Sequence, residues 1–270
     1  MNRLQGKVVL ITGAARGMGA ITARLFSAEG ALVVIADVLD VEGERLAAEL
    51  GERAIFCRLD VTQEEDWSAA VKAALERWGR IDGLVNNAGI AHSQAIAATR
   101  KEDFERVLAV NLVGPFLGIK AVAPVMTAQR SGSIVNISSI GGMTAWNSMA
   151  AYCSSKWGMR GLSRVAAMEL GHQGVRVNSI HPGGINTDMG GMFDEDTDAL
   201  DRAYAQQPIQ RIGRPNEVAQ TSLFLICDDS SYICGTEVVV DGGALTGRYF
   251  DGLPGAPNPA TGIEVQAQGD

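Results

Sequence analysis

Cysteine and histidine are scarce in this 270-residue sequence, which has four cysteines and three histidines. The cysteines stand alone in apolar stretches with no CxxC spacing, and the histidines lie far apart. Metal-binding motifs place such residues at short fixed spacings, so the sequence predicts no metal site. Four scattered cysteines also predict buried thiols in a reducing compartment, and we interpret Cys153, which follows a tyrosine, as a packing residue.

Basic residues are outnumbered, with 23 Lys and Arg against 31 Asp and Glu and a formal net charge of −8. An acidic chain without a basic cluster is a poor match for nucleic acid or anionic lipid, so we expect neither as a partner. No apolar run approaches the roughly 18 residues of a membrane helix, and the N-terminus has no signal-cleavage pattern. These absences predict a soluble, cytoplasmic protein.

Seven short β-branched runs alternate with stretches of helical periodicity. They cover residues 7–13, 31–37, 54–60, 83–89, 132–139, 175–183 and 237–243. Most are continuously apolar, as expected of parallel strands that are covered on both faces. The alternation predicts a single-domain, doubly wound α/β (Rossmann) fold, a parallel sheet of about seven strands with helices on both faces.

Two segments interrupt this alternation. Residues 186–215 form a long, glycine-containing, acidic stretch, and a loop of that length inside a compact domain is usually functional, so we expect a lid over the substrate. Residues 248–270 contain three of the eight prolines and are predicted to lack regular structure. The expected organisation is therefore one cofactor-binding and catalytic domain over residues 1–247, followed by an irregular tail.

The first predicted strand ends in the turn TGAARGMG, residues 12–19, and a helix follows. Gly13, Gly17 and Gly19 would allow the backbone to approach a pyrophosphate at the positive helix N-terminus, although such glycines can also serve a turn alone. The second strand ends at Asp37, whose carboxylate can accept hydrogen bonds from the adenosine ribose and would repel a 2′-phosphate. We therefore predict NAD rather than NADP; Arg16 in the same turn is the one residue that could favour a phosphate.

A tyrosine and a lysine four residues apart, Tyr152 and Lys156, open a helical stretch and so share one face. Tyrosine has a pKa of about 10 and is a poor base at neutral pH, whereas a nearby ammonium would stabilise the phenolate and lower that pKa. Ser139, at the end of the fifth strand, can hydrogen-bond a substrate oxygen. The Tyr–Lys spacing is common on helices, so the prediction of acid–base catalysis depends on its occurrence with the serine and the glycine turn.

Taken in order, the motifs resemble the short-chain dehydrogenase/reductase family. They are TGAARGMG, Asp60–Val61 after the third strand, NNAG at 86–89, Ser139, YCSSK at 152–156 and PGGINT at 182–187, and together they span Lys7 to about Gly243. The segments IADVLD, DGLVNNAGI and SSKWGMRGLS look most similar to the bacterial 3α/20β-hydroxysteroid dehydrogenase type. The resemblance implies a nicotinamide cofactor and an NAD-dependent short-chain alcohol dehydrogenase, built as a homotetramer on the helix 151–170 and the stretch 236–247.

The resemblance also implies a role for individual residues. Tyr152 would be the general acid and base, Lys156 would also hold the nicotinamide ribose, and Asn111 would hold a water behind the lysine. The backbone of Ile185 and the hydroxyl of Thr187 would face the cofactor's carboxamide and phosphate. The full cofactor-binding set implied is Gly13, Arg16, Gly17, Met18, Gly19, Asp37, Asp60, Val61, Asn87, Ala88, Gly89, Tyr152, Lys156, Pro182, Gly183, Ile185 and Thr187.

Large apolar side chains lie between the predicted catalytic residues and in the predicted lid. They are Met143, Trp146, Met149, Met189, Met192 and Phe193. They predict an adaptable apolar wall and hence a hydrophobic cyclic alcohol or ketone, such as a hydroxysteroid, although they could instead pack the lid or a subunit interface.

Several alternative functions stay open. A polyol, sugar or dihydrodiol dehydrogenase would need a more polar pocket. A carrier-protein-linked ketoacyl reductase would favour NADPH and a basic docking patch, which Asp37 and the acidic composition disfavour. A non-catalytic nucleotide-binding protein on the same scaffold typically lacks the tyrosine or the lysine, and this chain has both.

Overall fold

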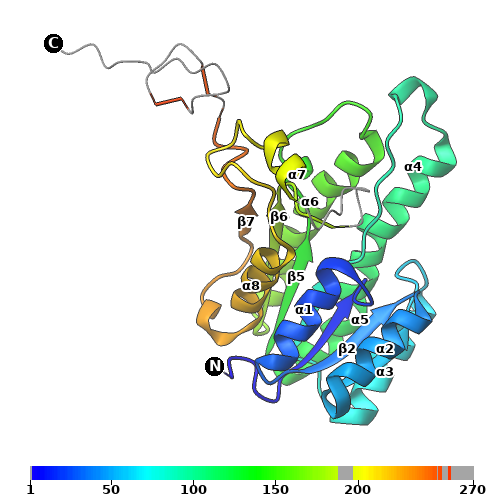
Figure 1. Ribbon diagram of the computed structural model, residues 1–270. Helices are drawn as coiled ribbons and strands as arrows, with labels where there is room; N and C mark the ends of the chain where they lie inside the picture. Colours follow the sequence, from blue (N-terminus) through cyan, green and yellow to red (C-terminus); the bar gives the residue numbers. More distant parts are fainter. Residues whose placement is uncertain (1, 188–196, 248, 251–254, 257–270) are drawn as a thin grey trace.

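The computed structural model describes residues 2–187, 197–247, 249–250 and 255–256. Within them, seven strands form one parallel sheet in the order β3-β2-β1-β4-β5-β6-β7 (Figure 1). The sheet grows from β1 toward β3 on one side and from β4 toward β7 on the other, so it is doubly wound. The strands are β1 Val8–Thr12, β2 Leu32–Asp37, β3 Ala54–Arg58, β4 Gly83–Asn86, β5 Gly132–Ile137, β6 Val175–Pro182 and β7 Glu237–Val240.

Helices cover both faces of the sheet (Figure 1). One layer consists of α1 (Gly17–Ala28), α2 (Asp40–Leu50) and α8 (Pro215–Ile226), and the other of α3 (Glu64–Trp78), α5 (Gly114–Gln129) and α6 (Ala150–Gly171). The remaining helical elements are α4 (Lys101–Leu108), α7 (Asp198–Ala203), the π-helix η3 (Ala109–Val113) and the 3-10 turns η1 (Gly51–Arg53), η2 (Ile96–Ala98), η4 (Ile140–Gly142) and η6 (Asp228–Ser230).

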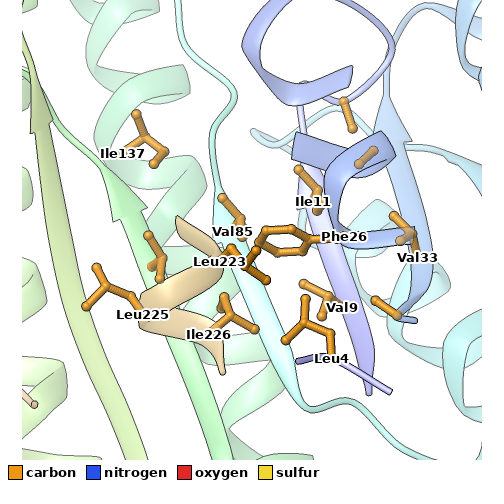
Figure 2. Close-up of a cluster of buried hydrophobic side chains, with 14 of the residues drawn as sticks. Leu4, Val9, Ile11, Phe26, Val33, Val85, Ile137, Leu223, Leu225 and Ile226 are labelled. Carbon is orange, nitrogen blue, oxygen red and sulfur yellow. The ribbon is translucent and has the colours of Figure 1, made fainter. Parts of the chain in front are cut away.

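Two hydrophobic cores, one on each face, hold the layers together. Val9 of β1 packs in one core with Phe26 of α1 and Leu223 of α8, as Figure 2 shows. Its neighbour Val8 belongs to the opposite core, with Trp67 of α3. Successive residues of β1 point to opposite faces, and both faces are buried, which is why the sequence shows a continuous apolar run. Each such side chain contributes about 1.5–3 kcal/mol through burial.

The helical segment 101–129, which joins α4, η3 and α5, is long and apolar enough to cross a membrane by length and composition. In this structure Leu117, Val122 and Met126 of α5 are buried in the core with β4 and β5 residues. The core helix of a soluble protein passes the same length and hydropathy test, because burial in protein demands the same apolar character.

The predicted fold class is confirmed in its sheet, its parallel strands and its two helical layers. The strand predicted at 83–89 is shorter than expected and ends at Asn86, because Asn87 and Ala88 leave the sheet and bond the chain at the end of β1. The predicted lid contains α7 and runs into α8, while its residues 188–196 lie outside the described residues. Almost all of the predicted tail also lies outside them.

Candidate active site

Most of the predicted site residues lie beyond the carboxyl ends of β1 to β6 and in the N-terminal turns of α1 and α6, and Asn111 lies in η3. Because all seven described strands are parallel, these ends share one edge of the sheet. The strand order reverses between β1 and β4, and in open α/β sheets ligands bind outside the carboxyl ends at such a switch point.

The turn after β1 requires its glycines for steric reasons. Gly13 and Gly17 have φ angles of 61° and 53°, in the left-handed region that favours glycine. A Cβ at Gly19 would lie 2.1 Å from the carbonyl oxygen of Gly13, and a Cβ at Gly13 would lie 2.8 Å from Cα of Ala88. Only glycine therefore lets α1 begin directly against the end of β1 and the chain after β4.

The N-terminus of α1 is open to an anion. Arg16 stands at the N-cap in extended conformation, its side chain makes no capping hydrogen bond, and the first turn contains no acidic residue. The Arg16 side chain is exposed and has no hydrogen-bond or ion-pair partner within the described residues. Uncapped amide groups and the helix dipole both favour a phosphate at this position, and Met18 belongs to the same turn.

Asn87 clamps the glycine turn from the neighbouring strand. Its side-chain nitrogen donates to the carbonyl oxygens of Thr12 and Gly13, at 2.9 and 3.1 Å. The Thr12 hydroxyl accepts in return from the backbone nitrogens of Asn87 and Ala88, both at 3.1 Å. The NNAG motif, which ends at Gly89, thus fixes the turn across the switch point, a role for the Asn87 side chain that the sequence did not indicate.

Asp37 joins the end of β2 to the glycine turn. One carboxylate oxygen accepts from the Ala15 nitrogen at 2.9 Å, and the other accepts from the nitrogens of Val38 and Leu39 at 2.8 and 3.2 Å. The residue is 8% exposed. Backbone amides hold the carboxylate in a single orientation, and its remaining lone pairs stay available to hydroxyl donors.

Two further members of the predicted cofactor set, Asp60 and Val61, form hydrogen bonds with residues that follow β3. Asp60 accepts at one oxygen from the nitrogen and hydroxyl of Thr62, and the Val61 carbonyl accepts from the indole of Trp67 at 2.9 Å. These contacts shape the turn that leads into α3.

After β6, the chain that leaves Pro182 is held against β7 and the segment before α8. The Gly183 nitrogen donates to the Val240 carbonyl at 2.9 Å, and Ile185 forms a β-bridge with Gly213. The Thr187 hydroxyl lies 3.5 Å from the Ile185 carbonyl oxygen.

Ser139 follows β5 and caps the turn η4. Its hydroxyl oxygen accepts from the Gly141 nitrogen at 3.0 Å, and the side chain is nearly fully buried. Because that oxygen already serves as an acceptor, the hydroxyl proton is available for donation to another oxygen.

Tyr152 and Lys156 lie in the first turns of α6, on the face that meets η4. Lys156 Nζ is 5.7 Å from the centre of the Tyr152 ring and donates to the Ile137 carbonyl at 2.9 Å. Burial lowers the pKa of Lys156 to about 8. Burial also raises the pKa of Tyr152, and a hydrogen bond with the Ser139 side chain only partly opposes this shift.

The direction of the tyrosine shift is opposite to the one expected from the Tyr–Lys spacing. The spacing places the ammonium beside the ring, but Nζ is directed to the Ile137 carbonyl, and the cost of burying a phenolate outweighs the favourable contacts. Neutral phenol is therefore the resting form of Tyr152 in this arrangement.

Asn111 lies in the π-helical turn η3 and is fully buried. Its side chain accepts from the Ile90 nitrogen at 2.8 Å and donates to the Ile90 carbonyl at 2.9 Å and to the Ser155 hydroxyl at 3.2 Å. Ser155 in turn donates to the Tyr152 carbonyl at 2.6 Å. Asn111 thus connects the chain after β4 to the turn of α6 that contains Tyr152, a link through Ser155 that the sequence did not indicate.

Of the predicted substrate residues that the structure describes, Trp146 has a ring contact with the predicted catalytic tyrosine. Its ring is stacked near that of Tyr152, with the centroids 6.5 Å apart and the planes at 23°. Met143 ends the turn η4, and Met149 immediately precedes α6; both are partly buried. The other three predicted residues, Met189, Met192 and Phe193, lie outside the described residues.

His181 is a functional candidate that sequence analysis missed. It is fully buried in β6, and its ring bonds the carbonyl of Ser139. The only sign in the sequence was a polar residue near the end of a strand predicted to be buried. Its contact with Ser139 could not be predicted, because the two residues are 42 positions apart along the chain.

Together these features suit a nicotinamide dinucleotide. The glycine turn has no room for a Cβ at Gly13 or Gly19, the N-cap residue of α1 makes no side-chain capping hydrogen bond, and Asp37 presents oriented acceptors at the end of β2. Beside this cradle, Ser139, Tyr152 and Lys156 converge from β5 and α6. A dinucleotide cradle next to an acid–base pair defines an oxidoreductase site.

Comparison with known proteins agrees with this class. The family model described as enoyl-(acyl carrier protein) reductase matches residues 13–245. The trans-4-hydroxycyclohexanecarboxylate dehydrogenase of Sinomonas cyclohexanicum is 43% identical, over 92% of this chain and 96% of that protein. The 3-alpha-(or 20-beta)-hydroxysteroid dehydrogenase of Mycobacterium tuberculosis is 44% identical, over 98% and 97%. The crystal structure of levodione reductase superposes with a TM-score of 0.83 at 36% identity, covering 89% of this chain and 98% of that one.

The chain belongs to the short-chain dehydrogenase/reductase family. Members of this family are oxidoreductases that use NAD or NADP, and this chain is an alcohol dehydrogenase-type member.

Proposed function

We propose that this protein is an NAD-dependent oxidoreductase that interconverts a secondary alcohol and a ketone on a hydrophobic cyclic substrate of hydroxysteroid type. The observation that carries the proposal is the convergence of Ser139, Tyr152 and Lys156 beside the glycine turn. The carboxylate of Asp37, held by three backbone amides, supports NAD over NADP because it would repel a 2′-phosphate.

The proposed substrate class has separate support. Trp146 places an aromatic face close to Tyr152, and Met143 adds an apolar, adaptable side chain nearby in sequence. The names of two relatives refer to hydroxyl groups on ring systems, a cyclohexane and a steroid. A flat or puckered apolar ring fits such surroundings better than a sugar does.

In the proposed mechanism, the nicotinamide ring supplies or accepts the hydride when the cofactor is bound. The Ser139 hydroxyl, whose oxygen accepts from the Gly141 nitrogen, donates a hydrogen bond to the substrate oxygen and orients it, and Ser139 keeps its proton throughout. The Tyr152 hydroxyl gives a proton to that oxygen during ketone reduction and removes it during alcohol oxidation.

The charge of Lys156 lies close enough to Tyr152 to favour its phenolate, with Nζ 5.7 Å from the ring centre. With a pKa of about 8 the lysine is mostly charged at neutral pH, and its cation opposes part of the cost of forming a buried phenolate. Since burial raises the tyrosine pKa, the phenol is the resting form, and alcohol oxidation should accelerate as pH rises while ketone reduction slows.

The test is reduction of NAD and NADP, followed by absorbance, over hydroxysteroids, cyclohexanols, polyols and, in reverse, ketoacyl and enoyl thioesters. We expect NAD-preferring turnover of a steroid or cyclohexanol, and a loss of about 10²–10⁴-fold in Tyr152→Phe with NADH binding retained. Turnover of acyl thioesters with NADPH would instead support a second candidate function, reduction of carrier-protein-linked acyl groups, which the description of the matching family model favours. Near-normal turnover in Tyr152→Phe would refute the mechanism.

We also propose that the protein acts as a homotetramer. Along α6, Trp157, Val165 and Met168 expose 49%, 53% and 82% of their surface, and on β7 Val239 exposes 41%. Large apolar side chains gathered on one helix and one edge strand are typical of subunit interfaces.

A further inference from the structure

His181 is buried directly behind the catalytic serine. It lies in β6, one residue beyond Ile180, which pairs with Ile137 of β5. Its Nδ1 is 3.0 Å from the carbonyl oxygen of Ser139, and its Nε2 is 2.9 Å from the hydroxyl oxygen of Ser179. The ring is 0% exposed, so both contacts form away from solvent.

These two contacts specify the tautomer of His181. A carbonyl oxygen only accepts, so Nδ1 carries the proton that it donates to Ser139. Burial lowers the pKa of His181 and favours the neutral ring, in which Nε2 is an acceptor. The Ser179 hydroxyl therefore donates to Nε2, in preference to the carbonyl of Thr236 at 3.5 Å.

The side chain of His181 continues the contact between β5 and β6 beyond the last backbone hydrogen bond. The last β5–β6 hydrogen bond runs from the Ser138 nitrogen to the Ile180 carbonyl at 2.8 Å. Beyond it the chain turns into η4, and the Ser139 carbonyl is held by the Gly142 nitrogen at 2.9 Å and by His181. The imidazole thus connects the turn η4 to the sheet at Ser139, the residue whose hydroxyl binds the substrate oxygen in the proposed mechanism.

We propose that His181, held as the Nδ1–H tautomer by Ser179, is a positioning residue that fixes the backbone of Ser139 and thereby the direction of its hydroxyl. Given the proposed function, its effect passes through Ser139 and not through the cofactor cradle. Loss of the imidazole lets the turn shift relative to Tyr152, and small misplacements of a catalytic group cost large factors in rate.

The kinetic test compares two replacements of His181. His181→Leu keeps an apolar volume but removes the donor, and we expect kcat to fall about tenfold or more with little change in NADH affinity. His181→Asn keeps an amide donor near the position of Nδ1 and should recover most of kcat. Ser179→Ala should lower kcat less than His181→Leu, because the ring keeps its bond to Ser139. Equal kcat losses in the Asn and Leu variants would overturn the proposal.

Asn178→Ala is the matched control. Asn178 lies in the same strand, is also 0% exposed, and bonds the backbone of Ile233 and Thr236 instead of Ser139. It should lower the unfolding temperature while leaving kcat nearly unchanged at a temperature where the protein is folded. A similar loss of kcat in Asn178→Ala would mean that His181 serves strand stability alone.

A double-mutant cycle tests whether His181 acts through the serine. In a Ser139→Ala background, His181→Leu should reduce kcat by much less than it does in the wild-type background. Full additivity of the two losses would refute the assignment, since it would place the effect of His181 elsewhere.

One measurement does not depend on turnover. In protein labelled with ¹⁵N-histidine, the ring nitrogens of His181, assigned by their absence in His181→Asn, should report an Nδ1–H tautomer at neutral pH. An Nε2–H or a doubly protonated ring would overturn the proposal. If the tautomer is as expected but no panel substrate turns over, the proposed function fails and the structural role of His181 stands.

Discussion

Lys156→Met removes a cation that folding buries without a counter-charge. The residue is 4% exposed, its Nζ donates to the Ile137 carbonyl, and within the described part of the chain no carboxylate pairs with it. A buried charge without a counter-charge lowers the free energy of unfolding, and proteins keep such groups where activity requires them. We therefore expect Lys156→Met to be inactive yet more stable than the wild type at neutral pH.

The magnitude follows from the pKa of Lys156, which burial lowers from 10.5 to about 8. Near pH 7 the lysine is protonated in both states, and holding the charge in the folded state costs about 3 kcal/mol. Near pH 9.5 the folded state holds a neutral lysine while the unfolded chain is still mostly protonated, and the cost falls to about 1.4 kcal/mol.

The sign of the pH dependence follows from proton counts. Between about pH 8 and 10.5 the unfolded state binds more protons at this lysine than the folded state does, so Lys156 makes wild-type stability rise with pH. The lost hydrogen bond to Ile137 costs the variant about 1–2 kcal/mol at either pH. The variant should thus be about 1–2 kcal/mol more stable near pH 7, with that advantage shrinking by about 2 kcal/mol near pH 9.5.

The assay is urea unfolding of both proteins at the two pH values, at one fixed protein concentration because subunit association also contributes to stability. The other titrating groups contribute equally to the free energy of unfolding of both proteins, so their contributions cancel in the difference. Lys72→Met, which replaces an exposed lysine on α3, is the control for removing a lysine charge that folding does not bury. A difference between wild type and Lys156→Met that stays constant with pH would refute the reasoning.

Three further predictions concern the cofactor cradle and the subunit surface. Gly19→Ala should weaken NADH binding about tenfold or more in a fluorescence titration, because its Cβ would lie 2.1 Å from the Gly13 carbonyl oxygen; unchanged affinity would contradict this packing. Asp37→Ala should shift preference toward NADP by about tenfold, whereas Asp40→Ala, an exposed neighbour, should not; an unchanged ratio would mean that Arg16 decides it. Met168→Glu on α6 should reduce the assembly measured by light scattering, and Ala69→Glu on α3 should leave it intact.

Local sequence was sufficient to predict the strands, the turn and the helices that carry the candidate site. A continuous apolar run, a glycine turn and a helix can be recognised within about twenty residues, and the Tyr152–Lys156 spacing places both side chains on one helix face whatever surrounds it. These features depend on backbone conformation and periodicity, which neighbouring residues along the chain determine.

The orientation of the groups could not be predicted in the same way. The tyrosine pKa shift was expected in the wrong direction, because spacing says nothing about burial or about the Ile137 carbonyl that holds the lysine. Likewise, the side chain of Asn87 gave no sign that it would clamp a turn about 75 residues earlier in the chain.

The sequence by itself determined the order of strands and helices along the chain, the glycine turn and the common helix face of Tyr152 and Lys156, since each is set by local steric and periodic constraints. Only the tertiary structure decided which partners those residues have. Ser139 meets His181 because β5 and β6 are neighbours in the sheet, and Asn111 reaches Ser155 because η3 packs on α6. Such contacts arise from packing between distant segments, where burial and hydrogen-bond partners, and hence pKa values, are fixed.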